Sequence, residues 1–351
     1  MSKNRIHNIL QEQKNILARE ITEKQYGMYS DYWSKFGEKG KVKSQRDASY
    51  HLSFLAEAIL MEDSEIFTDY IEWVKLLFRE ISLPNEVMFT TLRCMDEILS
   101  NHLIPSDYNT AEHYINEGIK QLKKSVKEVP PYIDINAPLG QLAKEFNNAL
   151  INGNKTKASN LILKAVEDGV TIQDIYLNVF QKSQLETGRL WLMNKISVAK
   201  EHYVSAATQM IMSQLYPYIF STERKGYTFI GACAGGELHE IGLRMVSDFF
   251  EMDGWDTYYL GANTPVSTII SAIKEYKADV LGLSIAMPYH QSTLKESIKG
   301  IRQKIKKQQT KILVGGNGIN NKQHIWEKIG ADGYAPDAKQ ALELANRIIQ
   351  Q

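Results

Sequence analysis

The sequence predicts an α/β domain at the C-terminal end of a chain that is otherwise helical. From Tyr227 onward, short runs rich in Val, Ile, Leu and Tyr alternate with helical segments, whereas nearly everything before Thr222 has an amphipathic helical pattern. Strands that are apolar along their whole length, with helices between them, are typical of a parallel sheet covered on both faces. We therefore expect a flavodoxin-like, doubly wound sheet of about five strands, preceded by a four-helix bundle and an N-terminal helical domain.

Prolines divide the helical part of the chain. The stretches 129–132 and 137–138 interrupt the helical pattern, because proline disfavours helix at the residue before it. The expected domains are 1–126, a helical sensory or partner-binding domain; 130–222, the four-helix bundle; and 226–351, the sheet with its helices.

Apolar spacing supports the helices. Between Phe67 and Phe78 apolar residues recur at i, i+3, i+4 and i+7, the period of one helix face. The expected bundle has three such stripes: Leu142, Phe146, Leu150 and Ile151; Leu161, Ile162 and Val166; and Val204, Ala207, Ile211 and Leu215. Short joints between helices of this length favour a bundle.

The sheet domain has alternating strand and helix patterns. The expected strands are 227–234, 256–260, 280–284, 311–317 and 333–335. The expected helices are 240–253, 266–276, 291–307, 323–328 and 338–349, with Asp337 as a start signal for the last.

The composition argues against nucleic-acid binding, secretion and insertion into a membrane. Lysine plus arginine and aspartate plus glutamate number 41 each, so the chain lacks the basic excess of a nucleic-acid-binding protein. Two cysteines among 351 residues suit a reducing compartment. The polar N-terminus lacks a signal-peptide core, and no run approaches the ~20 apolar residues that span a bilayer. We expect a cytoplasmic protein that binds neither nucleic acid nor membrane.

A histidine follows the first expected strand. His239 lies on the loop before the next helix, at the carboxyl edge where open α/β sheets bind ligands. Glu237, two residues earlier, is placed to hold one ring nitrogen and leave the other for a metal. A lone Glu-x-His also suits an ordinary surface histidine, so the motif alone leaves both interpretations open.

The segment Glu237-Leu-His239-Glu-Ile-Gly242 resembles the Asp/Glu-x-His-x-x-Gly motif of cobalamin-binding domains, in which the histidine replaces the cofactor's own base beneath cobalt. Three later features follow in the family's order: a Gly-x-x-x-Pro turn, a serine ending the third strand and a glycine pair ending the fourth. The resemblance implies a cobalamin cofactor with His239 on the metal. The other implied cofactor-binding residues are Glu237, Gly242, Gly261, Thr264, Pro265, Ser284, Gly315 and Gly316.

A second constellation lies in the expected bundle. One continuous helix would separate Trp191 from His202 by roughly 16 Å, but the stretch 194–197 offers a break, with Ser197 as N-cap of the next helix. The spacing Trp-x9-Glu-His, with Glu201 next to His202, resembles the signature of CarH-type cobalamin photoreceptors. The resemblance implies that Trp191 covers an adenosyl group and that Glu201 and His202 line its pocket. The alternative is a Trp buried in a bundle core beside a solvent-facing polar pair.

The chain departs from the CarH-type pattern in two places. Residues 1–126 show no counterpart of its MerR-type DNA-binding domain, and Leu192 stands where a histidine often follows the capping Trp. The first expectation is a non-enzymatic light sensor in which loss of the adenosyl group from adenosylcobalamin changes domain packing or oligomeric state. Its expected partners are further copies of the chain and an unknown protein.

Other interpretations stay open. The chain also suits a corrinoid methyl carrier of a methyltransferase system or a cobalamin-dependent antirepressor. The added N-terminal helical domain resembles the plan of photocobilins, which implies a second chromophore such as biliverdin in residues 1–126. Cys94 is the one candidate for its covalent anchor, but an apolar helical stripe around it favours an inert buried thiol.

Overall fold

The computed structural model describes residues 2–28, 30–220, 222–319 and 325–350. They form two compact units, Met1–Glu128 and Val129–Gln351, which we call the N-terminal unit and the C-terminal unit. None of the described helices is both long enough and apolar enough to cross a membrane.

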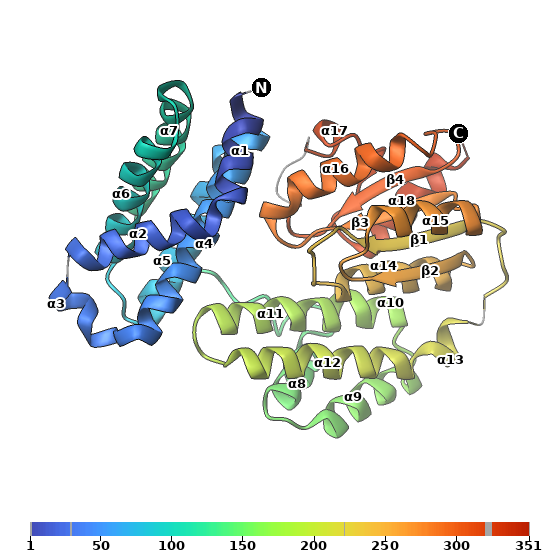
Figure 1. The fold of residues 1–351 in the computed structure, drawn as a ribbon. Coiled ribbons are helices and arrows are strands. Elements are labelled where there is room, and N and C mark those ends of the chain that lie inside the picture. The colour runs from blue at the N-terminus through green and yellow to red at the C-terminus, as the bar shows by residue number, and fades with distance from the viewer. Residues whose placement is uncertain (1, 29, 221, 320–324, 351) are drawn as a thin grey trace. The chain divides into compact units, whose positions relative to one another are not determined.

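The regular elements described in the N-terminal unit are all helices (blue to teal in Figure 1). Its elements are α1 (Ser2–Glu12), α2 (Lys14–Met28), α3 (Ser30–Trp33), η1 (Ser34–Phe36), α4 (Gly37–Met61), α5 (Ser64–Glu80), α6 (Asn85–His102) and α7 (Pro105–Leu122). The predicted stripe on α5 is buried at Phe67, Ile71 and Val74. Asp63 caps α5 by accepting a hydrogen bond from the Glu65 amide, and a proline begins α7.

Buried charges in this unit are paired. The fully buried Asp107 carboxylate accepts hydrogen bonds from Arg5 at 2.6 and 2.7 Å, which ties α7 to α1. The fully buried Lys75 ammonium donates to Glu72 and to the carbonyl oxygens of Gln121 and Ser125. Such partners offset the cost of removing a charge from water.

The first half of the C-terminal unit is also helical. Its elements are α8 (Gly140–Ile151), α9 (Lys155–Glu167), α10 (Ile172–Ile175), the π-helical turn η2 (Tyr176–Phe180), α11 (Gln181–Leu192), α12 (Val198–Gln214) and α13 (Tyr216–Ile219). The apolar stripes predicted from sequence meet in one core around Phe146, Ile162 and Ile211. Ser197 caps α12 by accepting a hydrogen bond from the Lys200 amide, so the predicted break before this helix is confirmed.

The second half contains the predicted parallel sheet. Its strands are β1 (Thr228–Cys233), β2 (Asp256–Gly261), β3 (Val280–Ser284), β4 (Lys311–Gly315) and β5 (Gly333–Tyr334), in the spatial order β2-β1-β3-β4-β5. All neighbouring pairs are parallel, so the carboxyl ends of the strands meet at one edge. The central strands β1 and β3 are buried almost completely, which explains their uninterrupted apolar sequences.

Helices cover the sheet, as the doubly wound prediction requires. They are α14 (Ile241–Met252), α15 (Val266–Tyr276), α16 (Gln291–Arg302), α17 (Ile325–Lys328) and α18 (Ala338–Ile348). Helix α14 packs with α18, and α15 packs with α16. Met245 and Phe249 of α14 also belong to the core of the preceding helices, so α14 joins the helical layer to the sheet (Figure 1).

Several predicted boundaries in the sheet domain differ from the structure by one residue, β4 ends at Gly315 instead of 317, and α16 differs most. Helix α16 ends at Arg302 instead of 307, because Arg302 donates to the Thr310 carbonyl and pairs with Asp332, and a turn then returns the chain to β4. The last strand is one residue shorter than predicted. The expected helix 323–328 is described from Ile325 onward; Gln323 and His324 lie outside the described residues. Asp337 caps α18 through the Gln340 amide, as predicted.

Candidate functional site

The strand order places a topological switch point between the carboxyl ends of β1 and β3. The chain leaves β1 toward β2 on one side and later reaches β3 on the other, so the following loops diverge there. Ligands of open α/β sheets bind at such a switch point. The loop after β1 carries Glu237 and His239, and the loop after β3 carries His290.

Glu237 holds His239 by two hydrogen bonds. Its Oε1 accepts from the His239 backbone amide at 2.9 Å and from the ring Nδ1 at 2.6 Å. The carboxylate is fully buried, whereas 64% of the His239 side chain is exposed. Because Nδ1 carries the donated hydrogen, Nε2 is the ring nitrogen whose lone pair remains for a ligand.

The hydrogen bonds shift the pKa values of both Glu237 and His239. Burial alone would raise the pKa of the Glu237 carboxyl, but hydrogen bonds from His239 and His290 outweigh it and hold that pKa well below its usual range. The hydrogen bond to Glu237 is the main cause that raises the pKa of His239, with burial acting against it and the Glu201 charge adding to it. Glu237 is therefore an anion at neutral pH, and it makes His239 a more basic ligand.

The second oxygen of Glu237 binds the loop after β3. Oε2 accepts from the backbone amides of Ala286 at 2.7 Å and Met287 at 3.2 Å, and from Nδ1 of His290 at 3.1 Å. Sequence reasoning missed His290, which showed no metal-ligand spacing. Its position on the loop after a central strand, at the same sheet edge as His239, was the signal that could have found it.

The loop after β2 closes one side of the site. Thr264 is buried; its hydroxyl donates to the Gly261 carbonyl and its amide to the Cys233 carbonyl, while Pro265 leads into α15. Asn263, also missed from sequence, accepts from the Gly236 amide at 2.8 Å and donates its own amide to the Glu237 carbonyl. These bonds fix the Glu237 loop from the β2 side.

Glycines let backbone segments approach closely at the ends of β3 and β4. Gly316 has φ +96°, and a Cβ there would stand 2.3 Å from the Ile285 carbonyl oxygen and 2.9 Å from Ser284 Oγ. A Cβ on Gly315 would stand 2.8 Å from the Ala335 carbonyl oxygen. Only glycine suits these two positions. Gly242 differs, because a Cβ there would meet nothing within 4 Å.

The helical residues singled out from sequence lie at one end of α11 and α12, near the turn that joins them. Trp191 is 40% exposed, so the alternative of a Trp buried in the bundle core is wrong. His202 is 75% exposed and its Nδ1 lies 2.7 Å from Glu201 Oε2. The pair is therefore mutually hydrogen-bonded, with the imidazole reaching solvent.

Helix α12 contacts the His239 loop directly. Gln209 donates to the side chain of Glu240, the residue after His239, at 3.4 Å. Arg244 of α14 donates to the Gln209 carbonyl at 3.3 Å and to Ser213 at 2.8 Å. Glu201 lies near enough for its charge to raise the pKa of His239. The structure thus packs helix α12 against the loop that carries His239.

The donor set fits the cobalt of a cobalamin. A cobalamin brings a ring of nitrogen ligands for its own metal, so the protein would need to offer only one neutral nitrogen ligand. His239 offers this, with Nδ1 held by a buried carboxylate and Nε2 presented on an exposed side chain. Glu237 and His239 therefore fit a cobalamin, and Gly242, three residues after His239, has open space beside it.

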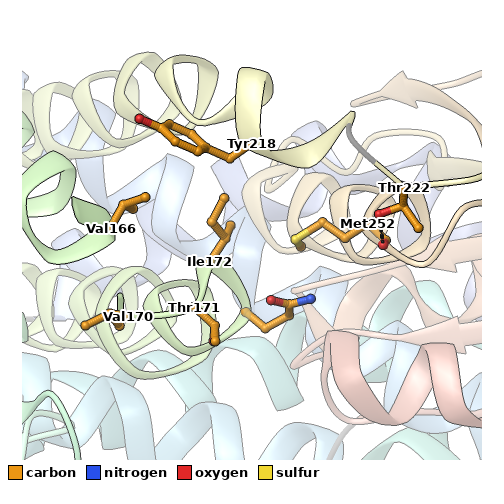
Figure 2. Close-up of a pocket in the computed structure, with 8 residues that line it drawn as sticks. Val166, Val170, Thr171, Ile172, Tyr218, Thr222 and Met252 are labelled. Carbon is orange, nitrogen blue, oxygen red and sulfur yellow. Dashed lines mark hydrogen bonds between the residues drawn. The ribbon is translucent and has the colours of Figure 1, made fainter. Parts of the chain in front are cut away.

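A separate pocket of about 270 Å³ lies away from these residues. Figure 2 shows it between the α9–α10 corner, α13 and the end of α14, with Tyr218 across from Ile172 and Met252 to one side. Its lining includes none of the residues predicted for the site.

Comparison with known families identifies the class of this unit. Residues 227–343 match a family described as B12 binding domain, and residues 142–216 match a second family with that description. The chain therefore contains a cobalamin-binding module, and both matches fall in the C-terminal unit.

Individual relatives are corrinoid proteins. A corrinoid protein of Desulfitobacterium hafniense (strain Y51) is 27% identical over 214 residues, which are 59% of this chain and 97% of that protein. Dimethylamine corrinoid protein 2 of Methanosarcina acetivorans is 24% identical over 60% of this chain and 96% of its own length. The solved monomethylamine corrinoid protein of Methanosarcina barkeri has a TM-score of 0.54 and 20% identity, and covers 60% of this chain and 100% of its own. That likeness shows a shared fold.

Proposed function

We propose that this protein is a corrinoid carrier that binds cobalamin with the cofactor's own base displaced and passes methyl groups between partner enzymes. The observation that carries the proposal is the buried Glu237 carboxylate fixing Nδ1 of His239 at the switch point of the sheet, with Nε2 open. Relatives named as dimethylamine corrinoid proteins, matched over nearly their whole length, support the carrier over the light sensor.

The residues of the chain would have distinct tasks. When bound, the corrinoid supplies a cobalt atom able to accept and release a methyl group. His239 would hold the metal through Nε2, and Glu237 keeps the imidazole oriented and basic. The cofactor's tail would lie along the residues with small side chains or close backbone at the same edge: Gly242, Gly261, Thr264, Pro265, Ser284, Gly315 and Gly316.

Helices α11 and α12 would cover the side of the cofactor that faces away from His239. Trp191, Glu201 and His202 are the proposed lining of that side, and all three are at least partly exposed. A carrier needs this face within reach of a methyltransferase, and the exposed end of α11 and α12 suits such access. We therefore propose residues 130–222 as the cap over the cofactor and a methyltransferase as the protein partner.

One observation favours a second candidate. The relatives match about 60% of this chain, and both family matches lie in the C-terminal unit, so the N-terminal unit is an addition to the carrier plan. Together with Trp-x9-Glu-His, it supports a sensor in which light removes the adenosyl group of adenosylcobalamin. In that case residues 1–126 would bind a protein partner or a bilin such as biliverdin.

Spectroscopy of the purified full chain with hydroxocobalamin tests the cofactor site. We expect one cofactor per chain and the spectrum of a displaced base with histidine on cobalt; His239→Ala should give a base-off spectrum and weaker retention. An unchanged spectrum in that variant would exclude His239 as the ligand.

A second measurement separates carrier from sensor. A carrier, once its cofactor is chemically reduced, should be methylated by methyl iodide and keep its elution volume in dark and light. A sensor loaded with adenosylcobalamin should change elution volume after illumination. A red absorption band that survives desalting after expression with biliverdin would favour the sensor with two chromophores.

A further inference from the structure

Gln291 is a polar residue on an apolar helix face. It begins α16, and the residues three, seven and ten positions later, Leu294, Ile298 and Ile301, form a buried aliphatic stripe. Gln291 is itself fully buried, at the position where this stripe would continue with another aliphatic side chain. A buried amide costs free energy unless it is hydrogen-bonded, so a glutamine at this position points to polar partners.

Only one end of the Gln291 side-chain amide is hydrogen-bonded. Its Nε2 donates to the Gly318 carbonyl at 2.6 Å, whereas its Oε1 has no hydrogen-bond partner within the part of the chain that the structure describes. A carbonyl oxygen can only accept, so the NH2 group must face Gly318 and the free atom is the oxygen. Buried acceptors in folded proteins are almost always paired. The free Oε1 therefore indicates a ligand that brings an N–H or O–H donor.

The contact with Gly318 places Gln291 beside residues proposed to hold the tail of the cofactor. The Gly318 amide donates to the Ile285 carbonyl at 3.0 Å, and Ile285 directly follows Ser284 at the end of β3. Gly316, two residues before Gly318, lies so close to the same strand end that a Cβ there would stand 2.9 Å from Ser284 Oγ. Gln291 thus binds the loop that carries Gly316 and that packs against the end of β3.

We propose that Oε1 of Gln291 accepts a hydrogen bond from the nucleotide tail of the bound corrinoid, and that this bond makes the chain discriminate among corrinoids by their tails. The inference rests on the proposed cobalamin site and adds a specificity-determining residue to it. The phosphate and the dimethylbenzimidazole of cobalamin offer no donor at neutral pH. The ribose hydroxyl groups do, and so does the amino group of a corrinoid whose base is adenine. A buried acceptor discriminates strongly against a ligand that lacks the donor, because the acceptor then stays unpaired.

Equilibrium binding to the full chain tests this bond with three corrinoids: cobalamin, the analogue with adenine as its base, and cobinamide, which lacks the nucleotide. Gln291→Met keeps the length of the side chain and removes the acceptor. If a ribose hydroxyl is the donor, this variant should bind cobalamin and the adenine analogue about tenfold more weakly. If the adenine amino group is the donor, only the adenine analogue should lose affinity, by about the same factor.

Two controls accompany that comparison. The affinity for cobinamide should be the same in Gln291→Met and the unaltered chain, which shows that the variant is folded. Gln303→Met changes an exposed glutamine just after α16 and should leave all three affinities unchanged.

The outcomes separate this inference from the proposed function. If the unaltered chain shows no histidine-on spectrum with cobalamin that His239→Ala abolishes, the cobalamin site fails, and the role of Gln291 fails with it. If that spectrum is present, equal affinities of Gln291→Met and the unaltered chain for both nucleotide-bearing corrinoids overturn the role of Gln291 alone. An equal loss of affinity for cobinamide overturns it too, because the acceptor would then serve the fold or the corrin ring.

Should Gln291→Met fail to fold, the unaltered chain decides by itself. Methylation of the ribose hydroxyls should weaken the binding of cobalamin about tenfold, or adenine as the base should strengthen it about tenfold, depending on which group is the donor. Equal affinities for cobalamin, its ribose-methylated form and the adenine analogue would contradict the proposal.

Discussion

Tyr176, in the π-helical turn η2, donates its hydroxyl to the Asp248 carboxyl of α14 at 2.8 Å, with both side chains buried. This bond joins the helical layer of the C-terminal unit to the helix that covers the sheet. Arg244 extends the contact by donating to the Tyr216 hydroxyl at 3.1 Å. Any motion that lifts these helices from α14 would have to break or stretch this cluster.

The first prediction concerns the pH dependence of stability. Burial raises the pKa of Asp248 to about 6, so the folded protein binds a proton that the unfolded chain releases near pH 4. Stability therefore falls as pH rises between these values and levels off above about 6. Asp248→Asn keeps an acceptor for Tyr176 and removes the titration. Relative to the unaltered protein, it should gain about 3 kcal/mol at pH 7.5 and almost nothing at pH 4.

Urea unfolding at the two pH values measures that difference. Tyr176→Phe serves as the companion variant: it removes the donor and leaves the carboxyl buried, so it should be destabilised at both values. A stability difference for Asp248→Asn that is the same at pH 4 and pH 7.5 would contradict the assignment.

The second prediction uses the open space beside Gly242. Gly242 is the second residue of α14, and an alanine Cβ there would touch nothing within 4 Å. Gly242→Ala should leave the cofactor-free protein as stable as before or stabilise it by up to about 1 kcal/mol. If cobalamin occupies that space, its affinity should fall at least tenfold. Thermal melting measures the stability of the variant, and equilibrium binding of hydroxocobalamin measures its affinity. An unchanged affinity of Gly242→Ala for hydroxocobalamin would place the corrin elsewhere.

The third prediction is that, unlike Gly242, Gly316 cannot be replaced by alanine without loss of stability. Its φ of +96° and the Ile285 carbonyl 2.3 Å from a built Cβ mean that alanine must shift backbone. We expect Gly316→Ala to cost more than about 2 kcal/mol even without cofactor. Denaturant unfolding of the two glycine variants side by side tests the contrast. A Gly316→Ala protein as stable as Gly242→Ala would show that the loop relaxes easily.

The fourth prediction concerns Trp191, which is 40% exposed at the end of α11. If a cofactor ligand packs beneath its indole, Trp191→Ala should weaken binding of adenosylcobalamin more than that of hydroxocobalamin, because only the former carries a large upper ligand. We expect a difference of about tenfold, the scale of burying part of one aromatic side chain. Equal losses for both cofactors would remove Trp191 from the upper face.

Cys94 provides the fifth prediction. It is 1% exposed, and burial raises the pKa of its thiol to about 11. Thiolate is the reactive form, so iodoacetamide at pH 8 should modify Cys94 only after denaturation. Mass spectrometry of native and unfolded samples checks this. Rapid modification of the native protein would reopen Cys94 as an anchor for a chromophore.

The sequence by itself determined what depends on neighbouring residues. The apolar runs of β1 and β3 predicted buried parallel strands, and capping chemistry placed the helix starts at Ser197 and Asp337. Glu237 and His239 are two residues apart, so their hydrogen bond needs only one tight loop.

Only the tertiary structure decided which distant loops meet. His290 reaches Glu237 from 53 residues away because β1 and β3 are adjacent in the sheet. The contact between Gln209 and Glu240 depends likewise on how α12 packs against the loop after β1, which no local pattern encodes. Side-chain spacing specifies helices and strands, whereas strand order and layer packing bring their ends together. The position of His290 after a predicted strand was readable from sequence, but its hydrogen bond to Glu237 was decided by the strand order.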